Sequence, residues 1–137
     1  MIGPVIREGC DMAGILIVDD EPHIRILLEQ TLEELEDEGV ELSTADNGLN
    51  ALNLIKDEKP DLVFLDVMMP GMNGFEVCSA VKNELGLKDV FIIMLTAKGQ
   101  EFDKQKGIEV GADIYMTKPF DPDEVVEKAR KVLGLPD

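Results

Sequence analysis

Short apolar runs alternate with amphipathic stretches along most of the chain, and glycine, proline or acidic residues separate them. Three runs, residues 15–18, 62–65 and 90–95, contain only apolar side chains. Runs this short and this apolar are typical of strands buried on both faces, as in a parallel sheet. Residues 40–45 alternate and predict an edge strand, and residues 113–116 predict a short fifth strand.

Between these runs, apolar residues recur at helical spacing. Pro22 suits the first turn of a helix, where its missing N–H costs nothing, and Asp46 or Asn47 can cap the next helix. The predicted helices run from Pro22 to a stop at Gly39, from residue 47 to a stop before Pro60, over residues 75–85, over about residues 100–110, and from Pro122 or Asp123 to Leu133. Five strand–helix units in strict alternation predict an α/β fold, a doubly wound five-stranded parallel sheet with helices on both faces.

Composition narrows the class of protein. At 137 residues, 45% hydrophobic and 31% charged, the chain is predicted to form one folded domain. A net charge of −16 argues against direct binding to nucleic acid or a membrane surface. Cys10 and Cys78 stand alone, so we expect reduced thiols in a cytoplasmic protein rather than a disulfide or zinc framework. Residues 1–12 show no period and no signal-peptide pattern, and are interpreted as a flexible extension before a domain of residues 13–135.

Polar side chains follow the predicted strands at the points where the strands end. Asp19 and Asp20 follow the first strand, Asp66 the third, Thr96 the fourth and Lys118 the fifth. Because the carboxyl ends of parallel strands share one edge, these five side chains can converge there. Three carboxylates packed together repel unless one is protonated or a cation neutralises them, and such oxygen ligands suit Mg²⁺, with Mn²⁺ as a substitute.

This set of side chains predicts phosphoryl chemistry without a nucleotide. Lys118 would supply a positive charge to one phosphoryl oxygen and Thr96 a hydroxyl donor to another. The sequence contains no glycine-rich nucleotide loop of the known kinds. The group handled is therefore best interpreted as a phosphoryl carried by Asp66 itself, as an aspartyl phosphate.

The sequence resembles the receiver domain of a two-component response regulator, over roughly residues 13–135. The motifs that carry the resemblance are Asp19-Asp20-Glu21, the stretch from Leu65 to Gly74 around Asp66, Thr96-Ala97, and the stretch from Gly111 to Phe120 that contains Tyr115 and Lys118. The resemblance implies a flavodoxin-like (βα)5 fold with strand order 2-1-3-4-5. It also implies a phosphorylation-dependent signalling switch that catalyses only its own phosphorylation and dephosphorylation and is otherwise not an enzyme.

The resemblance assigns a role to each site residue. Asp66 would accept the phosphoryl group, with Lys118 and Thr96 beside it. Mg²⁺ would be held by Asp20, Asp66 and the backbone carbonyl of Met68, and by Asp19 through water. Thr96 and Tyr115 would form the switch, and Pro119 would follow a cis peptide bond.

The implied partners are a sensor histidine kinase or phosphotransfer protein upstream, and a downstream protein target or a missing output domain. The partner-binding face would be formed by the fourth predicted helix (about residues 100–110), the fifth strand and the fifth helix. The sequence leaves open the cognate kinase, the phosphoryl lifetime, and whether phosphorylation drives dimerisation.

Two other functions remain as alternatives. An aspartyl-phosphate phosphatase needs a second acid two residues after its nucleophile, where this chain has Met68. A flavodoxin-like electron carrier needs a hydroxyl- and glycine-rich phosphate loop after the first strand, where this chain has Asp19-Asp20-Glu21.

Overall fold

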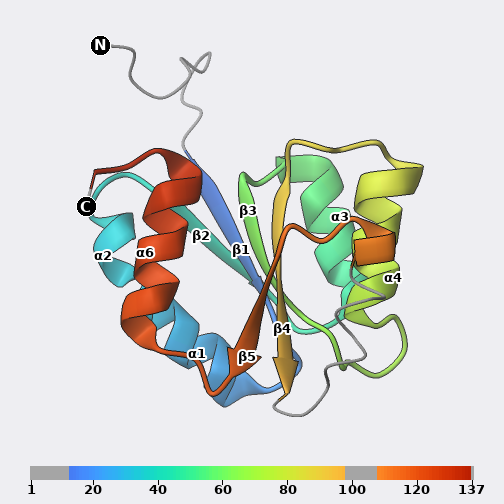
Figure 1. Cartoon of the computed structure of the whole chain (residues 1–137), viewed down its shortest axis with the longest axis horizontal. Helices are drawn as coiled ribbons and strands as arrows, with labels where there is room; N and C mark the ends of the chain where they lie inside the picture. The colour runs from blue at the N-terminus through green and yellow to red at the C-terminus, as the bar shows by residue number, and fades with distance from the viewer. Residues whose placement is uncertain (1–12, 98–107, 137) are drawn as a thin grey trace.

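Five parallel strands form the centre of the protein. The computed structural model describes residues 13–97 and 108–136. The sheet has the order β2-β1-β3-β4-β5, and all its neighbouring strands are parallel (Figure 1). The strands are β1 (Gly14–Val18), β2 (Glu41–Ala45), β3 (Leu62–Asp66), β4 (Phe91–Ala97) and β5 (Ile114–Lys118). The predicted fold class and the implied strand order are confirmed, with β2 at an edge.

Helices cover both faces of this sheet, as predicted (Figure 1). One face carries α1 (Pro22–Thr31), α2 (Glu33–Glu36) and α6 (Pro122–Leu133), and the other carries α3 (Gly48–Glu58) and α4 (Gly74–Ser79). Two hydrophobic clusters, one under each helical layer, share the sheet between them. Asn47 caps α3 by accepting a hydrogen bond from Asn50 N (2.8 Å).

The first predicted helix is broken where the sequence pattern runs on. Leu32 has φ −95° and ψ 4° and separates α1 from α2, which then ends at Glu36 before the turn to Gly39. The Thr31 hydroxyl donates to the Leu27 carbonyl (2.7 Å), a back-bond that bends helices. Leu28, Leu32 and Leu35 all remain buried, so the break preserves the apolar face that predicted the helix.

The third predicted helix changes its winding part-way. After α4 the chain continues as a π-helical segment, η1 (Ala80–Glu84), and Leu85 N donates to the Ala80 carbonyl (2.8 Å). Gly86 follows with φ 68°, so the predicted stop is in place.

Two expectations fall on residues that the structure does not describe. Most of the predicted helix at about residues 100–110 lies outside the described range, although residues 108–110 are helical. The extension at residues 1–12 also lies outside it. Within the described residues, every helix is too short or too polar to cross a membrane.

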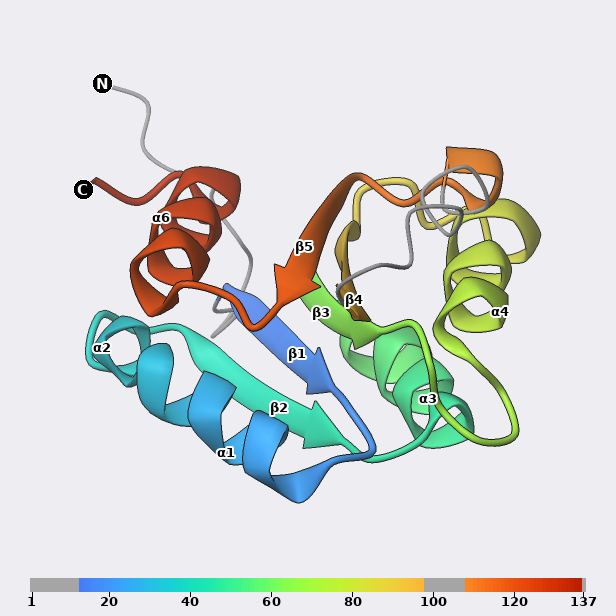
Figure 2. The ribbon, with the colours of Figure 1, turned by 60° about the horizontal axis from the view of Figure 1, so that its bottom comes forward.

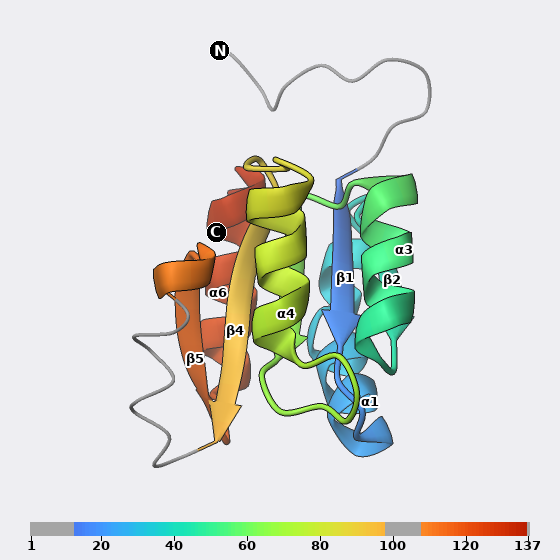
Figure 3. The same ribbon diagram turned by 90° about the vertical axis from the view of Figure 1, so that its right-hand side faces the viewer.

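Because all five strands are parallel, their carboxyl ends lie at one edge of the sheet, where the candidate site residues are expected. The arrowheads of β1 and β4 point the same way in Figure 3, and Figure 2 shows the ends of β1, β2, β3 and β5 from nearer that edge. In the register of the sheet, Asp66 lies opposite Leu95, and Lys118 lies opposite Ala97. The last residues of β3 and β5 are therefore held on either side of the end of β4.

Candidate functional site

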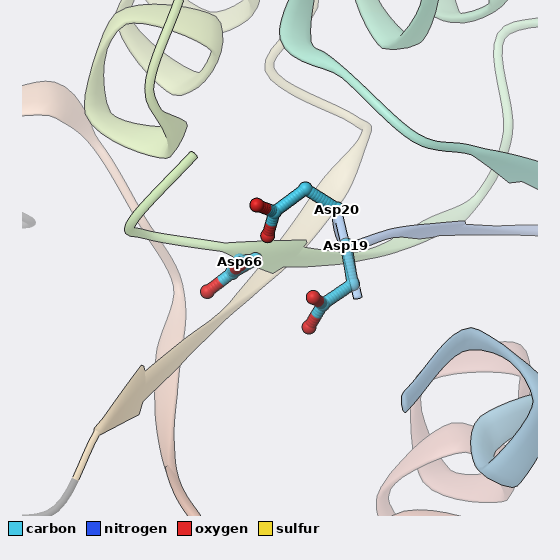
Figure 4. Close-up of side chains that lie close together, drawn as sticks. All are labelled: Asp19, Asp20 and Asp66. Carbon is cyan, nitrogen blue, oxygen red and sulfur yellow. The ribbon is translucent and has the colours of Figure 1, made fainter. Parts of the chain in front are cut away.

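Three aspartates meet at the carboxyl ends of β1 and β3 (Figure 4). Asp66 is the last residue of β3, and Asp19 and Asp20 directly follow β1. Asp19 and Asp66 are only 0% and 4% exposed, whereas Asp20 is partly exposed. One carboxylate oxygen of each residue lies within 4.8 Å of one from each of the others. The convergence expected from the strand ends is present.

Lys118 reaches this cluster from the end of β5. Its Nζ donates to Asp19 Oδ2 (2.8 Å) and to Asp66 Oδ1 (3.2 Å), and lies 3.7 Å from Glu21 Oε1. The peptide bond between Lys118 and Pro119 is cis. A single ammonium group therefore contacts two buried carboxylates from different strands.

The electrostatics of Asp66 follow from this crowding. Burial and, after it, the charge of Asp19 raise the pKa of Asp66, the charge and hydrogen bond of Lys118 lower it, and together they hold this pKa at about 7. For Lys118, burial lowers the pKa, but the hydrogen bond to Asp19 and the charge of Asp66 outweigh this and hold it above its ordinary value. The cluster carries more negative charge than Lys118 neutralises.

The loop after β3 is fitted closely to Asp66. Met68 N donates to Asp66 Oδ1 (3.3 Å), and Gly74 N donates to the Val67 carbonyl (3.0 Å). A β-carbon on Gly74 would overlap the Asp66 carbonyl oxygen and lie 2.9 Å from Val67 Cα, so only glycine fits there. Asn73 and Glu76 form a capping box at the start of α4 and fix where the loop ends.

The two predicted switch residues lie on β4 and β5. Thr96 is the second-last residue of β4; it is buried and lies opposite Thr117 in the sheet register. Tyr115 is partly buried, lies opposite Met94, and packs against the hydrophobic cluster under α3 and α4. The structure thus brings Asp19, Asp20, Asp66 and Lys118 into one cluster and places Thr96 at the same edge, whereas Tyr115 lies three residues before Lys118.

Two residues of the site have no role in the sequence analysis. Glu21, adjacent to the two aspartates, approaches Lys118. Arg25 Nη1 donates to the Asp19 carbonyl (2.8 Å) and so braces the turn from β1 into α1. Glu21 could have been found from its place beside Asp20, but the reach of Arg25 back to Asp19 depends on the path of α1.

The aspartate cluster fits a small hard cation. The three oxygens are close enough to share one ion, and the raised pKa of Asp66 shows that the charge there is under-compensated. Asp19 already accepts bonds from Lys118 and from Glu21 N (2.9 Å), whereas Asp20 is partly exposed. Mg²⁺ prefers such oxygen ligands and retains several of its waters.

Comparison with known proteins places these features in context. A model of the response regulator receiver domain matches residues 15–130. The alkaline phosphatase synthesis transcriptional regulatory protein PhoP of Bacillus subtilis is 48% identical over 120 residues, covering 87% of this chain and 48% of that protein. The phosphate regulon transcriptional regulatory protein PhoB of Pseudomonas aeruginosa is 49% identical over 119 residues, covering 87% of this chain and 51% of that protein.

A solved structure of a response regulator is also similar to this chain. The chemotaxis response regulator CheY4 of Vibrio cholerae matches with a TM-score of 0.77 at 37% identity, covering 90% of this chain and 100% of that one. The chain spans about half the length of the curated relatives described above.

Proposed function

Because the chain belongs to the response regulator receiver domain family, we propose that Asp66 accepts a phosphoryl group from a phosphohistidine on a sensor histidine kinase or phosphotransfer protein. Receiver domains of two-component systems are signalling domains whose output depends on phosphorylation. The observation that carries the proposal is the contact of Lys118 with both Asp19 and Asp66 beside the partly exposed Asp20.

In the transfer, a carboxylate oxygen of Asp66 attacks the phosphorus and the phosphorus–nitrogen bond of the donor breaks. The bonding electrons go to the imidazole nitrogen, and the product on Asp66 is a mixed carboxylic–phosphoric anhydride. Lys118 lowers the pKa of Asp66 against burial and the charge of Asp19, which favours the ionised nucleophile. The same ammonium group then lies beside the phosphoryl oxygens and opposes their charge.

A divalent cation completes the site in this proposal. Asp20, Asp66 and the backbone carbonyl of Met68 would hold Mg²⁺ or Mn²⁺ directly, and Asp19 would reach it through water. The bonds that Asp19 already makes to Lys118 and Glu21 N support this outer position. When bound, the cation neutralises charge on the carboxylates and on the phosphoryl group.

Phosphorylation would be communicated through Thr96 and Tyr115. New phosphoryl oxygens at Asp66 would attract the Thr96 hydroxyl, and Tyr115 would turn inward as the end of β4 moves. The responding face would comprise residues 100–110, β5 and α6. The register that aligns Thr96 with Thr117 and Met94 with Tyr115 supports this coupling, because the two switch strands are hydrogen-bonded neighbours.

The output is proposed from the relatives. PhoP and PhoB are transcriptional regulatory proteins about twice as long as the matched region, and CheY4 is a chemotaxis regulator that the match covers in full. This chain would therefore act on a downstream protein or through an output domain. Its proposed compartment is the cytoplasm, where a thiol such as that of Cys78 stays reduced.

The proposal is tested by intact mass after incubation with acetyl phosphate, with and without Mg²⁺. We expect one added phosphoryl group that requires Mg²⁺, is lost at alkaline pH, and is absent from Asp66→Asn. Asp46→Asn, which changes an exposed carboxylate outside the cluster, serves as the matched control and should be phosphorylated like the wild type. Equal labelling of wild type and Asp66→Asn would refute the assignment.

A further inference from the structure

Gly48 is the first residue of α3, and it is packed directly against the loop that follows Asp66. A β-carbon on Gly48 would overlap the Met72 carbonyl oxygen and lie 2.8 Å from Met72 Cβ and 3.0 Å from Val77 Cγ2. The residue is buried. The first turn of α3 therefore lies so close to the β3–α4 loop that a β-carbon does not fit between them.

Space, rather than backbone conformation, requires glycine at this position. Gly48 is not among the residues with positive φ, so its conformation is one that alanine also adopts. Intrinsic helix propensity by itself favours alanine over glycine in a helix. The atom that would lie nearest to a β-carbon here is the Met72 carbonyl oxygen, and a backbone carbonyl cannot rotate away as a side chain can.

The loop in contact with Gly48 carries part of the proposed phosphorylation site. Its two ends are joined by the hydrogen bond from Gly74 N to the Val67 carbonyl, and its backbone at Met68 donates to Asp66 Oδ1. Gly74 fixes the loop against Asp66 on one side, and Gly48 receives Met72 on the other. Met72 and Met68 therefore belong to one short loop that is held between Asp66 and α3.

We propose that Gly48 is a positioning residue for divalent-cation binding: the missing side chain lets Met72 settle against α3, which places the Met68 backbone at the aspartate cluster. This inference rests on the proposed function, in which the Met68 carbonyl is a ligand. It predicts that Gly48→Ala weakens cation binding although every carboxylate of the cluster remains.

The test compares Gly48→Ala with Gly14→Ala. A β-carbon on Gly14 would lie 3.7 Å from Pro60 Cα, an ordinary contact, at the opposite end of β1 from the site. Calorimetric titration of the metal-free proteins with Mg²⁺ should show the dissociation constant of Gly48→Ala raised about tenfold, as is typical when a group that orients a ligand is disturbed. Gly14→Ala should bind like the wild type.

A second readout separates positioning from a general loss of structure. The rate of phosphorylation by acetyl phosphate should need more Mg²⁺ for half its maximum in Gly48→Ala, while the rate at saturating Mg²⁺ stays near that of the wild type. A lower maximum with an unchanged Mg²⁺ requirement would overturn the inference. If Gly48→Ala does not fold, the same titration of Met72→Gly decides, because that variant removes the Met72 side chain, which packs against the hydrophobic cluster under α3 and α4 and whose Cβ lies beside Gly48, and so loosens the loop on α3 while its carbonyl stays; an unchanged dissociation constant would overturn the inference.

The two proposals fail in different ways. If the wild type neither binds Mg²⁺ nor gains a phosphoryl group, the proposed function is wrong and the role of Gly48 falls with it. If the wild type does both and Gly48→Ala binds Mg²⁺ equally well, only the role of Gly48 is wrong.

Discussion

The Nζ atom of Lys118 lies 2.8 Å from Asp19 Oδ2, although the two residues are 99 positions apart in the chain. The contact is made possible by the parallel sheet, which brings the ends of β1 and β5 to one edge with β3 and β4 between them. Since the same ammonium group also touches Asp66, its charge is divided between two buried carboxylates. Several properties of the protein should follow from this incomplete compensation.

The first prediction concerns pH in the absence of divalent cations. We expect the carboxyl carbon resonance of Asp66 to titrate near pH 7, because burial raises its pKa to about 7. Lys118→Met should move this midpoint upward by removing the charge that opposes the shift, and Asp19→Asn should move it downward. A midpoint near 4 in the wild type would show that the Asp66 carboxyl is better compensated than the structure indicates.

The sign of the stability effect follows from the same shift. Between the ordinary pKa of 3.8 and about 7, the folded protein binds more protons at Asp66 than the unfolded chain does, so stability falls as pH rises through this window. Asp66→Asn should remove that fall and stabilise the metal-free protein at pH 8 by roughly 2–4 kcal/mol, since a tenfold change in proton affinity is worth about 1.4 kcal/mol. Urea unfolding of both proteins at pH 5 and pH 8 with a chelator measures the difference.

A second prediction concerns the ion pair between the buried Lys82 and the more exposed Asp113, far from the cluster. Lys82 Nζ lies 2.9 Å from Asp113 Oδ2 and also donates to the Lys88 carbonyl (3.2 Å). Lys82→Met should lower the free energy of unfolding by about 2–3 kcal/mol, below the cost of breaking a fully buried pair because the Asp113 side chain is 31% exposed. Chemical denaturation checks the value.

Two further variants make this second prediction specific. Lys88→Met changes an exposed lysine whose backbone carbonyl still accepts the bond from Lys82, so stability should change by less than about 0.5 kcal/mol. Adding Asp113→Asn to Lys82→Met should restore part of the loss, because the amide oxygen can still accept from Ile92 N and no unpaired charge remains. A double variant less stable than Lys82→Met alone would contradict the explanation.

The sheet and the location of the site could be predicted because both depend on local patterns. The apolar runs at 15–18 and 62–65 end in aspartates, and strict alternation of strands and helices sends those ends to one edge. The break at Leu32 and the π-helical segment at Ala80–Glu84 could not be predicted, because neither changes which side chains face the core. The helical spacing of apolar residues defines which face is buried, and more than one backbone conformation can present that face to the core.

Contacts between distant segments could not be predicted from the sequence where they do not involve the strand ends. Glu34 and Glu38 lie in an acidic run that suggests only a solvated surface, yet Arg130 of α6 pairs with both. Gly48 looks like any glycine near a helix start, and its contact with Met72 appears only when α3 and the β3–α4 loop are placed together. In each case the partner is chosen by packing rather than by spacing along the chain.

A third prediction concerns the effect of metal on stability. Mg²⁺ at about 100 times its dissociation constant should stabilise the folded protein by about 2.7 kcal/mol if it binds only the folded state. Asp20→Asn should lose most of this gain, because it removes the most accessible carboxylate of the cluster. Asp46→Asn should retain it. Thermal unfolding with and without Mg²⁺ tests the three proteins, and an equal gain in Asp20→Asn would place the ion elsewhere.

The final prediction uses Tyr115 as a built-in reporter of the switch, since the chain has one tyrosine and no tryptophan. Phosphorylation, or beryllofluoride with Mg²⁺, should change the tyrosine emission of the wild type as the partly buried ring moves. In Thr96→Ala the phosphoryl group should still be added to Asp66, because Asp66 and Lys118 are intact. The emission change should shrink severalfold, since the variant lacks the buried hydroxyl that we propose as the link between the two events. Thr117→Ala is the matched control: it removes an exposed hydroxyl at the paired position on β5 and should respond like the wild type. If Thr96→Ala kept the full emission change at equal phosphorylation, the signal would have to reach Tyr115 by a route that does not include Thr96.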